Sequence, residues 1–430
     1  MKYLSLFILA CFTLVATGGC EKSQPLPQGV TVFSQPQELK IVELPHRALP
    51  LWRVPSEEKP SLVLLSADAL LQPIPAQLQE QVRKLALNGS RAELIAHGPL
   101  RAETVILPGQ TLRAALSAGL FSQVLWVLPQ SSAEEAIDLD ATRDALFTSG
   151  AIDDYEAQSL EKTSNGFRGT LAGTPFEALL ASSLPSIKLE TPAVLHIDLT
   201  FFTSLYRDEI KTPIYPLITQ NLLNLKSSGI RIISSTFSLD TLIGQTPLDL
   251  RFIGKTVKTT FSDPTLFDRP APNIWELRAK ARYFNTFFQP DKTLELTRKL
   301  LKLTPGNASS HYALYQELRL NKMHEEAIIA LNEAVALEPA YSREYMLLAA
   351  QNYQQGNLEG TVLNYQRALK AYPQDVTIKI NLAQALSDAK QRDDARALLN
   401  KLRQLNWTAS YYSETIPFLD ALLAEQQAQP

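Results

Sequence analysis

Short apolar runs alternate with amphipathic stretches in the first part of the chain, from Val30 to Thr260. Continuous apolar runs of this kind are typical of strands buried on both faces, as in a parallel sheet covered by helices. The stretches at 75–89, 110–120 and 215–229 have the spacing of amphipathic helices. This alternation predicts an α/β domain over residues 30–262, with a mainly parallel sheet flanked by helices. The predicted strands are SLVLLS (61–66), TVILP (104–108), QVLWVLP (123–129), AVLHIDL (193–199) and IRIISSTF (230–237).

Two segments inside this domain depart from the alternation. The hydrophilic stretch 131–165 predicts an inserted helical excursion. The segment TLAGTPFEALL (170–180) contains glycine and threonine but no lysine that could reach a phosphate, so it predicts a turn that leads into a helix.

A different regularity begins after the proline-bearing stretch 263–273, which serves as the predicted linker. From residue 274 onward the pattern is almost continuously helical, and equivalent residues recur at an interval of 34 (339 − 305 and 373 − 339 for the prolines). The interval predicts a stack of helical hairpins over residues 274–430, each ended by a proline. The recurring positions are Pro305, Pro339 and Pro373; Ala327, Thr361 and Ala395; Leu314, Leu348 and Leu382; and Leu300, Ala334, Ala368 and Leu402.

The period, the small residues where two helices cross and the closing proline resemble the tetratricopeptide repeat. Three units lie at 308–341, 342–375 and 376–409, and a weaker one precedes them at 274–307. Because each repeat buries its apolar face only against a neighbour, the segment 411–427 is expected to form a cap helix.

The resemblance implies a surface that binds a protein or peptide. The first helix of each hairpin is expected to line its inner face. The residues predicted to contact a partner are polar or aromatic, without a strong charge: Tyr312, Gln316, Tyr345, Asn352, Lys379 and Gln384.

The first nineteen residues have the pattern of a secretory signal peptide. Lys2 precedes an apolar run, and the small residues Thr17, Gly18 and Gly19 lead directly to Cys20. This ending resembles the processing site of bacterial lipoproteins, which implies that Cys20 is acylated and becomes the mature N-terminus. Ordinary cleavage and an uncleaved anchor are the alternatives. Residues 20–29 are then a tether.

The resemblance to lipoproteins also implies an address. Glu21 stands where some lipoproteins carry an aspartate that retains them at the inner membrane. The expected location is therefore the bacterial cell envelope, at the outer membrane facing the periplasm. Because the only cysteines are Cys11 and Cys20, the mature chain is expected to have no internal disulfide.

The overall composition is that of a globular protein, with 45% apolar and 20% charged residues. The net charge of −3 is spread along the chain, and no basic run could neutralise several phosphates. Nucleic acid is therefore not an expected partner.

Three stretches of the first domain resemble an uncharacterised family related to the arginase and deacetylase superfold: HRALPLW (46–52) with SLVLLSADALL (61–71), QTLRAALSAGLFSQVLWVLP (110–129) and LHIDLTFF (195–202). Members of that superfold hold one or two divalent cations at the carboxyl ends of parallel strands, with an Asp-x-His-x-Asp cluster and a later Asp-x-Asp pair. The resemblance implies Asp68, His196 and Asp198 as the candidate metal ligands of this chain.

These metal motifs are incomplete here. The first cluster falls on Ser66, Asp68 and Leu70, and the second on Asp198 and Thr200. A divalent cation needs several ligands within about 2.0–2.6 Å, and Leu70 places an apolar side chain where a charged one is expected. His196 then has a second interpretation, as a hydrogen-bonded histidine at a strand end.

The sequence favours a lipid-anchored scaffold or assembly protein whose α/β domain is not catalytic and needs no cofactor. The alternative is a metal-dependent hydrolase that acts on amide, guanidine or acetyl groups, with a divalent metal ion at the three candidate ligands. A third hypothesis is that the α/β domain senses a small molecule at the ends of its strands without transforming it.

Overall fold

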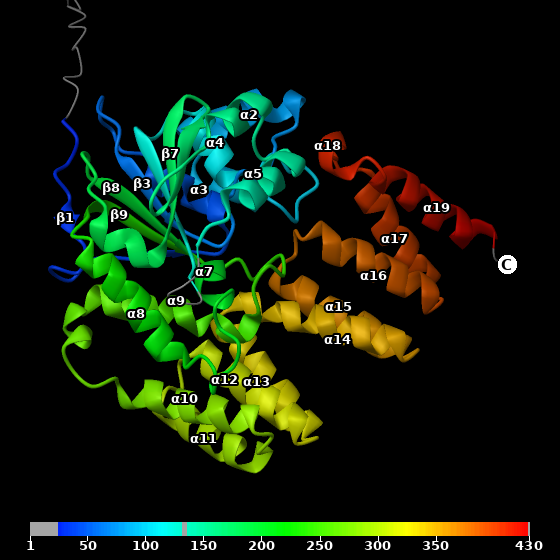
Figure 1. The fold of residues 1–430 in the computed structure, drawn as a ribbon. Coiled ribbons are helices and arrows are strands. Elements are labelled where there is room, and N and C mark those ends of the chain that lie inside the picture. Colours follow the sequence, from blue (N-terminus) through cyan, green and yellow to red (C-terminus); the bar gives the residue numbers. More distant parts are fainter. Residues whose placement is uncertain (1–24, 131–135, 429–430) are drawn as a thin grey trace, which may run out of the picture.

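A computed structural model describes residues 25–130 and 136–428 of the chain. An α/β domain is followed by a helical array that curves along one side of it (Figure 1). The predicted signal peptide and Cys20 lie outside the described residues. In the ranges that are described, we find no helix both long enough and apolar enough to cross a membrane.

The α/β domain is built on a nine-stranded sheet in the order β1-β9-β8-β3-β4-β7-β6-β5, with β2 also paired to β9. The pairs among β2, β9, β8, β3, β4 and β7 are parallel, whereas β1, β6 and β5 join by antiparallel pairing. The sheet is therefore mixed, with a parallel centre and antiparallel margins. The strands are β1 (Val30–Thr31), β2 (Lys40–Val42), β3 (Ser61–Leu65), β4 (Gln123–Leu128), β5 (Glu161–Lys162), β6 (Gly166–Leu171), β7 (Thr174–Leu180), β8 (Ala193–Asp198) and β9 (Arg231–Ser238).

Apolar side chains fill both faces of the central strands. In β3, Val63 and Leu65 belong to one core cluster, and Leu62 and Leu64 to the other. This division follows from the alternation of side chains along a strand. Residues of α8 and α9 pack in the first cluster, and residues of α2 and α4 in the second. The helices of this domain are α1 (Leu49–Trp52), α2 (Gln79–Asn88), α3 (Arg91–Ala96), α4 (Thr111–Ser117), α5 (Leu139–Thr148), α6 (Asp154–Ser159), α7 (Leu199–Thr203), α8 (Ile214–Ser227) and α9 (Phe252–Ser262).

The predicted strand at 104–108 is wrong. This segment is irregular up to a short 3-10 turn at Pro108–Gln110. The amides of Val105 and Ile106 both donate to the carbonyl of His97, at 2.7 and 3.1 Å, so they do not pair with a strand. Both side chains are nevertheless buried in the core, which explains an apolar run without strand geometry.

The predicted helix after the turn at 170–180 is also wrong, because the segment forms a β-hairpin. Strands β6 and β7 meet at Ala172 and Gly173, whose φ angles are 47° and 77°. A two-residue loop with positive φ at both positions matches the right-handed twist of the flanking strands. The predicted helical excursion at 131–165 is confirmed in part: α5 and α6 are helical, β5 at its end is a strand, and residues 131–135 lie outside the described part.

The second part of the chain consists of four antiparallel helix pairs and a closing helix. Prolines 305, 339 and 373 each stand two residues beyond the second helix of a pair, where the chain turns into the next repeat. The pairs are α10 (Asn273–Thr286) with α11 (Pro290–Leu303), α12 (Ala308–Leu320) with α13 (His324–Leu337), α14 (Arg343–Gln354) with α15 (Leu358–Ala371), and α16 (Val376–Asp388) with α17 (Arg392–Arg403); α18 (Ala409–Tyr412) and α19 (Thr415–Ala428) follow.

The turn inside each helix pair places one residue in the left-handed region. These residues are Phe288, Lys322, Gly356 and Lys390, with φ between 53° and 74°. They are 34 residues apart (322 − 288, 356 − 322 and 390 − 356), so each repeat has the same turn geometry. Only the third repeat has glycine, the residue that adopts this conformation without strain.

The helical array packs against the α/β domain through the turns between its repeats. Leu44, Leu242 and Ala340 form a small apolar cluster shared by the two parts. Further along, the amide of Val376 donates to the carbonyl of Leu100 at 3.1 Å, and that of Thr408 donates to Ala102 at 3.0 Å. The array covers the loops that follow β2 and β9. It therefore lies against the edge of the sheet at which the parallel strands end (Figure 1).

Candidate functional site

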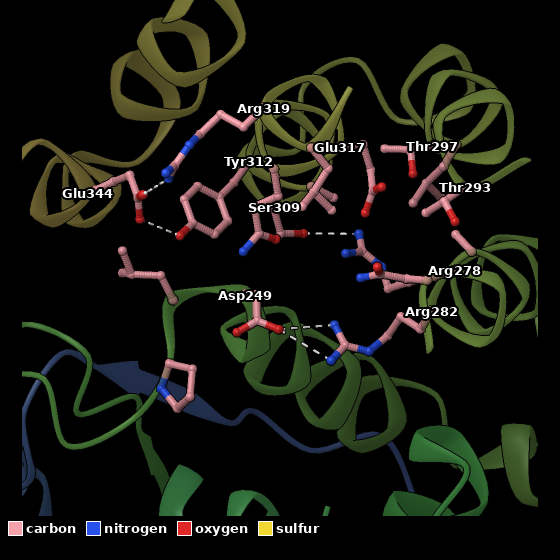
Figure 2. A pocket seen from close by; sticks show the side chains of 18 of the residues that line it. Asp249, Arg278, Arg282, Thr293, Thr297, Ser309, Tyr312, Glu317, Arg319 and Glu344 are labelled. Carbon is pink, nitrogen blue, oxygen red and sulfur yellow. Dashed lines mark hydrogen bonds and ion pairs between the residues drawn. The ribbon is translucent and has the colours of Figure 1, made fainter. Parts of the chain in front are cut away.

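A cavity of about 580 Å³ lies at the start of the helical array, between its first repeats and the α/β domain. Helices α10, α11, α12 and α14 supply most of its walls, and Pro247, Leu248 and Asp249 of the α/β domain close one side (Figure 2). We call this cavity the repeat groove. Its charged lining residues are Asp249, Arg278, Arg282, Glu317, Arg319 and Glu344.

One ion pair joins the two parts of the chain across the floor of the groove. Both terminal nitrogens of Arg282 lie 3.2 Å from the Asp249 carboxylate, and its Nε donates to the Tyr206 hydroxyl at 2.9 Å. Figure 2 shows this pair spanning from α10 to the turn that precedes α9. Asp249 and Arg282 therefore neutralise each other before any ligand enters.

A second charge pair closes the other end of the groove. The Glu344 carboxylate accepts hydrogen bonds from the hydroxyls of Tyr312 and Tyr315, both at 2.7 Å, and from Arg319 at 3.0 Å. Burial, followed by the charge of Glu344, raises the pKa of both tyrosines, so both stay protonated as donors. This network ties α12 to α14 and satisfies Glu344 internally.

Arg278 and Glu317 differ from these pairs because neither forms an ion pair with another described residue. Arg278 is 8% exposed and donates to the hydroxyls of Ser309 and Ser310 at 3.0 and 3.3 Å. Its guanidinium also lies 4.6 Å from the centre of the Phe252 ring, and burial lowers its pKa.

Glu317 is the corresponding carboxylate on α12. It is 6% exposed, and its Oε2 accepts no hydrogen bond from the described part of the chain. Burial raises the pKa of Glu317 to about 7, although the charge of Arg282 opposes this shift. The groove thus contains one unpaired group of each charge sign.

The groove also offers apolar surface. Leu320 and Leu347 line it and are 60% and 56% exposed, respectively. Exposed leucines beside charged groups are a common composition for surfaces that bind a partner. The groove can therefore bury an apolar side chain of a ligand next to its polar groups.

Of the six predicted contact residues, only Tyr312 and Gln316 line the repeat groove. Tyr345 does not line the groove; it is buried, and its hydroxyl donates to Asn332 on the neighbouring helix α13. Asn352 accepts a hydrogen bond from Asn357 at 3.3 Å. Gln384 donates to Asp388 at 3.1 Å, and Lys379 is half-buried on the same helix α16. The last three residues lie beyond the groove.

Sequence reasoning missed the charged residues of the groove, although the repeat interval contains a signal for them. Glu344 occupies the position that is Ile378 in the next repeat, and Glu317 the position that is Ala385 two repeats later. Both apolar counterparts are buried. The signal is partial, because the same positions hold Gln351 in the repeat after Glu317 and Ser310 in the repeat before Glu344.

The three candidate metal ligands lie at the carboxyl ends of β3 and β8. These two strands are neighbours, and the chain leaves them toward opposite faces of the sheet. Open α/β sheets bind ligands at such a point. Asp68 is exposed, and its Oδ1 accepts the amide of Leu70 at 2.8 Å. No group of three or more His, Cys, Asp or Glu side chains in the described ranges is arranged to hold a metal ion.

His196 and Asp198 are instead linked by hydrogen bonds to β9. The two ring nitrogens of His196 contact the hydroxyls of Thr236 and Ser238 at 2.8 and 2.9 Å. Asp198 accepts from Ser238 and from the amide of Thr200, the latter at 2.8 Å. Burial lowers the pKa of His196 to about 3 and raises that of Asp198, so the histidine is neutral. This geometry agrees with the interpretation of His196 as a hydrogen-bonded histidine in the sheet.

A further buried carboxylate, Asp240, follows β9. Its φ is 51°, its Oδ1 has no hydrogen-bond partner within the described chain, and burial raises its pKa to about 8. The charges of Asp198 and Asp68 contribute to this shift. The sequence did not single out Asp240, because no motif includes it.

Comparison with known proteins identifies the C-terminal part of the helical array. Residues 352–415 match the tetratricopeptide repeat family. No curated protein shows significant similarity to the chain. Among solved structures, one titled as the crystal structure of MamA protein is 18% identical, with a TM-score of 0.25, and the match covers 40% of this chain and 85% of that one.

A structure of YrrB, described as a tetratricopeptide repeat protein with an unusual peptide-binding site, is 14% identical, with a TM-score of 0.24, over 39% of this chain and 92% of that one. The observed helix pairs, their interval of 34 residues and the family match agree. The second part of this chain is therefore a helical repeat array, with tetratricopeptide repeats at residues 352–415, and it follows a mixed-sheet domain.

Proposed function

We propose that this protein is a scaffold or assembly factor that binds a segment of a partner protein in the repeat groove. The observation that supports this proposal best is the groove itself, where unpaired charged groups and exposed leucines lie together. Tetratricopeptide repeats commonly offer such concave surfaces to other proteins. The α/β domain contributes one wall of the groove through Leu248 and Asp249, so both parts of the chain shape the site.

Two substitutions at the groove test this proposal without removing a structural element. Leu320→Glu and Leu347→Glu place charges on side chains that are already more than half exposed, so the fold should tolerate them. A partner captured by the full chain from an envelope extract should be lost with either variant. Ile329→Glu on α13 is the matched control, because Ile329 is 61% exposed and does not line the groove.

Retention of the captured partner by both groove variants would contradict the proposal. Loss with Ile329→Glu as well would also contradict it, because binding would then not be specific to the groove. Circular dichroism of each variant establishes that its helices are intact.

We further propose that the chain is anchored in the bacterial envelope by a lipid on Cys20 and faces the periplasm from the outer membrane. The sequence of small residues before Cys20 and the tether after it support this proposal. Labelled palmitate should be incorporated into the wild-type protein and not into Cys20→Ser. Equal labelling of both proteins would exclude this site of attachment.

A further inference from the structure

Some charged residues of the repeat groove form ion pairs with each other, and others do not. Four of its charged groups are matched internally, as Arg282 with Asp249 and Arg319 with Glu344. Arg278 on α10 and Glu317 on α12 form no ion pair with another described residue, although the charge of Arg282 acts on Glu317. Each is more than nine-tenths buried.

Burying a charge without a partner carries a large desolvation cost. The hydroxyls of Ser309 and Ser310 orient Arg278 but bring no negative charge to it. Glu317 keeps one carboxylate oxygen that no donor in the described ranges reaches. A ligand that brings an anionic group to Arg278 and a cationic group to Glu317 would give each of these residues an ion-pair partner.

We propose that the repeat groove recognises a zwitterionic ligand: a peptide segment that carries one carboxylate for Arg278 and one ammonium or guanidinium group for Glu317. This inference rests on the proposed function and names the chemistry of the bound segment. A volume of about 580 Å³ accommodates a few side chains but not a folded domain. Leu320 and Leu347 add contacts for an apolar residue beside the charged ones.

The experiment uses the full chain and four blocked pentapeptides that share one leucine. The first contains glutamate and lysine, the second glutamate and glutamine, the third glutamine and lysine, and the fourth only glutamine at these positions. Calorimetry should show that the first peptide binds at least tenfold more tightly than each of the other three. Equal affinities for all four, or no binding of the first peptide, would overturn the inference.

Substitutions then assign each charge to its residue. With Arg278→Gln the glutamate should no longer contribute, so the first and third peptides should bind equally. With Glu317→Gln the lysine should no longer contribute, so the first and second peptides should bind equally. Lys280→Gln on α10 and Glu325→Gln on α13 are matched controls, because both side chains are exposed and neither lines the groove. Preferences unchanged in Arg278→Gln and Glu317→Gln would contradict the assignment.

The same chemistry could come from a small free zwitterion, which free lysine tests. Competition by free lysine that depends on both Arg278 and Glu317 would support the shared chemistry and identify a small molecule as the source. Binding of the blocked peptide alone would identify a protein segment. If the captured partner depends on Leu320 and Leu347 but the peptides show no charge preference, the zwitterion inference fails and the proposed function stands.

Discussion

Glu317 is the residue whose ionisation most directly links the groove to the stability of the chain. Its pKa is raised from 4.5 to about 7 in the folded protein. Between these values the unfolded chain ionises while the folded chain stays protonated, so the free energy of unfolding falls as the pH rises from about 4.5 to about 7. Below pH 4.5 the ionisation of Glu317 does not change the free energy of unfolding. Above pH 7 the full destabilisation from the buried carboxylate is present.

We therefore expect Glu317→Gln to stabilise the protein at pH 8, by on the order of 1–3 kcal/mol, and to have little effect at pH 4.5. Glutamine is a close mimic of the protonated acid, which is why the two agree at low pH. Urea unfolding of wild type and variant at both pH values measures the difference. The exposed Glu325→Gln serves as the control, and an equal effect of Glu317→Gln at both pH values would contradict the assigned pKa.

The candidate metal residues show what a sequence motif can and cannot specify. The motif placed Asp68 and Asp198 after two different parallel strands, and the structure shows that these strands, β3 and β8, are neighbours. It could not show that hydroxyls from β9 engage His196 and Asp198, because Thr236 and Ser238 lie some forty residues further along the chain. The directions of these side chains depend on tertiary contacts that a local pattern does not contain.

Metal content provides a direct measurement at these residues. We expect the purified full chain, after incubation with zinc, manganese and iron salts and gel filtration, to retain less than one equivalent of any of the three. The reason is that the His196 ring nitrogens already contact Thr236 and Ser238, while Asp68 is turned to its own loop. One bound equivalent that Asp198→Asn abolishes would instead favour the hydrolase alternative.

At the scale of elements, the turns inside the repeats carry backbone strain that is unequal between repeats. Gly356 adopts its left-handed conformation freely, whereas Lys322 and Lys390 hold the same conformation with a side chain. A left-handed residue other than glycine costs about 1–2 kcal/mol. The first, second and fourth repeats therefore bear a cost that the third repeat does not.

We expect Lys322→Gly to stabilise the protein by about 0.5–1 kcal/mol, since relief of strain exceeds the added entropy of the unfolded chain. Gly356→Ala should destabilise it by about 1 kcal/mol for the opposite reason. Thermal unfolding of both variants measures these changes, with exposed Lys280→Gly inside helix α10 as a control that should be destabilising. A loss of stability in Lys322→Gly would show that its side chain outweighs the strain.

The elements themselves were predictable where a long period was present. The interval of 34 residues located all four helix pairs, because every unit buries the same positions against its neighbours. Short segments were less predictable. The run at 104–108 is apolar because it fills the core, and the hairpin at Ala172 and Gly173 depends on pairing between β6 and β7. In both segments the tertiary environment outweighs the local pattern.

At the scale of the whole molecule, the repeat array and the α/β domain form a continuous structure. Arg251 lies at this junction, with its side chain almost fully buried. Its guanidinium donates to Glu43 of the α/β domain at 2.9 Å and to Glu338 at the end of α13, where Nε lies 3.0 Å from the carboxylate. Tyr341 packs beside it, 5.6 Å from ring centre to guanidinium. One side chain therefore couples the sheet, through its neighbouring loop, to the second repeat.

This coupling predicts that the two parts unfold together and that Arg251 is needed for them to do so. Arg251→Met should lower the free energy of unfolding by about 2–4 kcal/mol, because it leaves Glu43 and Glu338 without their shared cation. The cost stays below that of a fully buried pair, since these two carboxylates keep 28% and 37% of their side-chain exposure. Arg298→Met removes an exposed pair with Glu326 and should cost less than about 1 kcal/mol.

Hydrogen exchange can show whether Arg251→Met uncouples the unfolding of the two parts or only weakens the structure around Arg251. In wild-type protein, the slowest amides of β8 and of α12 should exchange with the same free energy, because both are released only by shared unfolding. In Arg251→Met, the α12 amides should exchange faster than those of β8, since the repeats can then open while the sheet stays folded. If the exchange free energies of β8 and α12 already differ in the wild type, the two parts unfold independently. The groove between them can then open without unfolding of the sheet. If they remain equal in the variant, other contacts such as those of Val376 and Thr408 are sufficient to hold the junction.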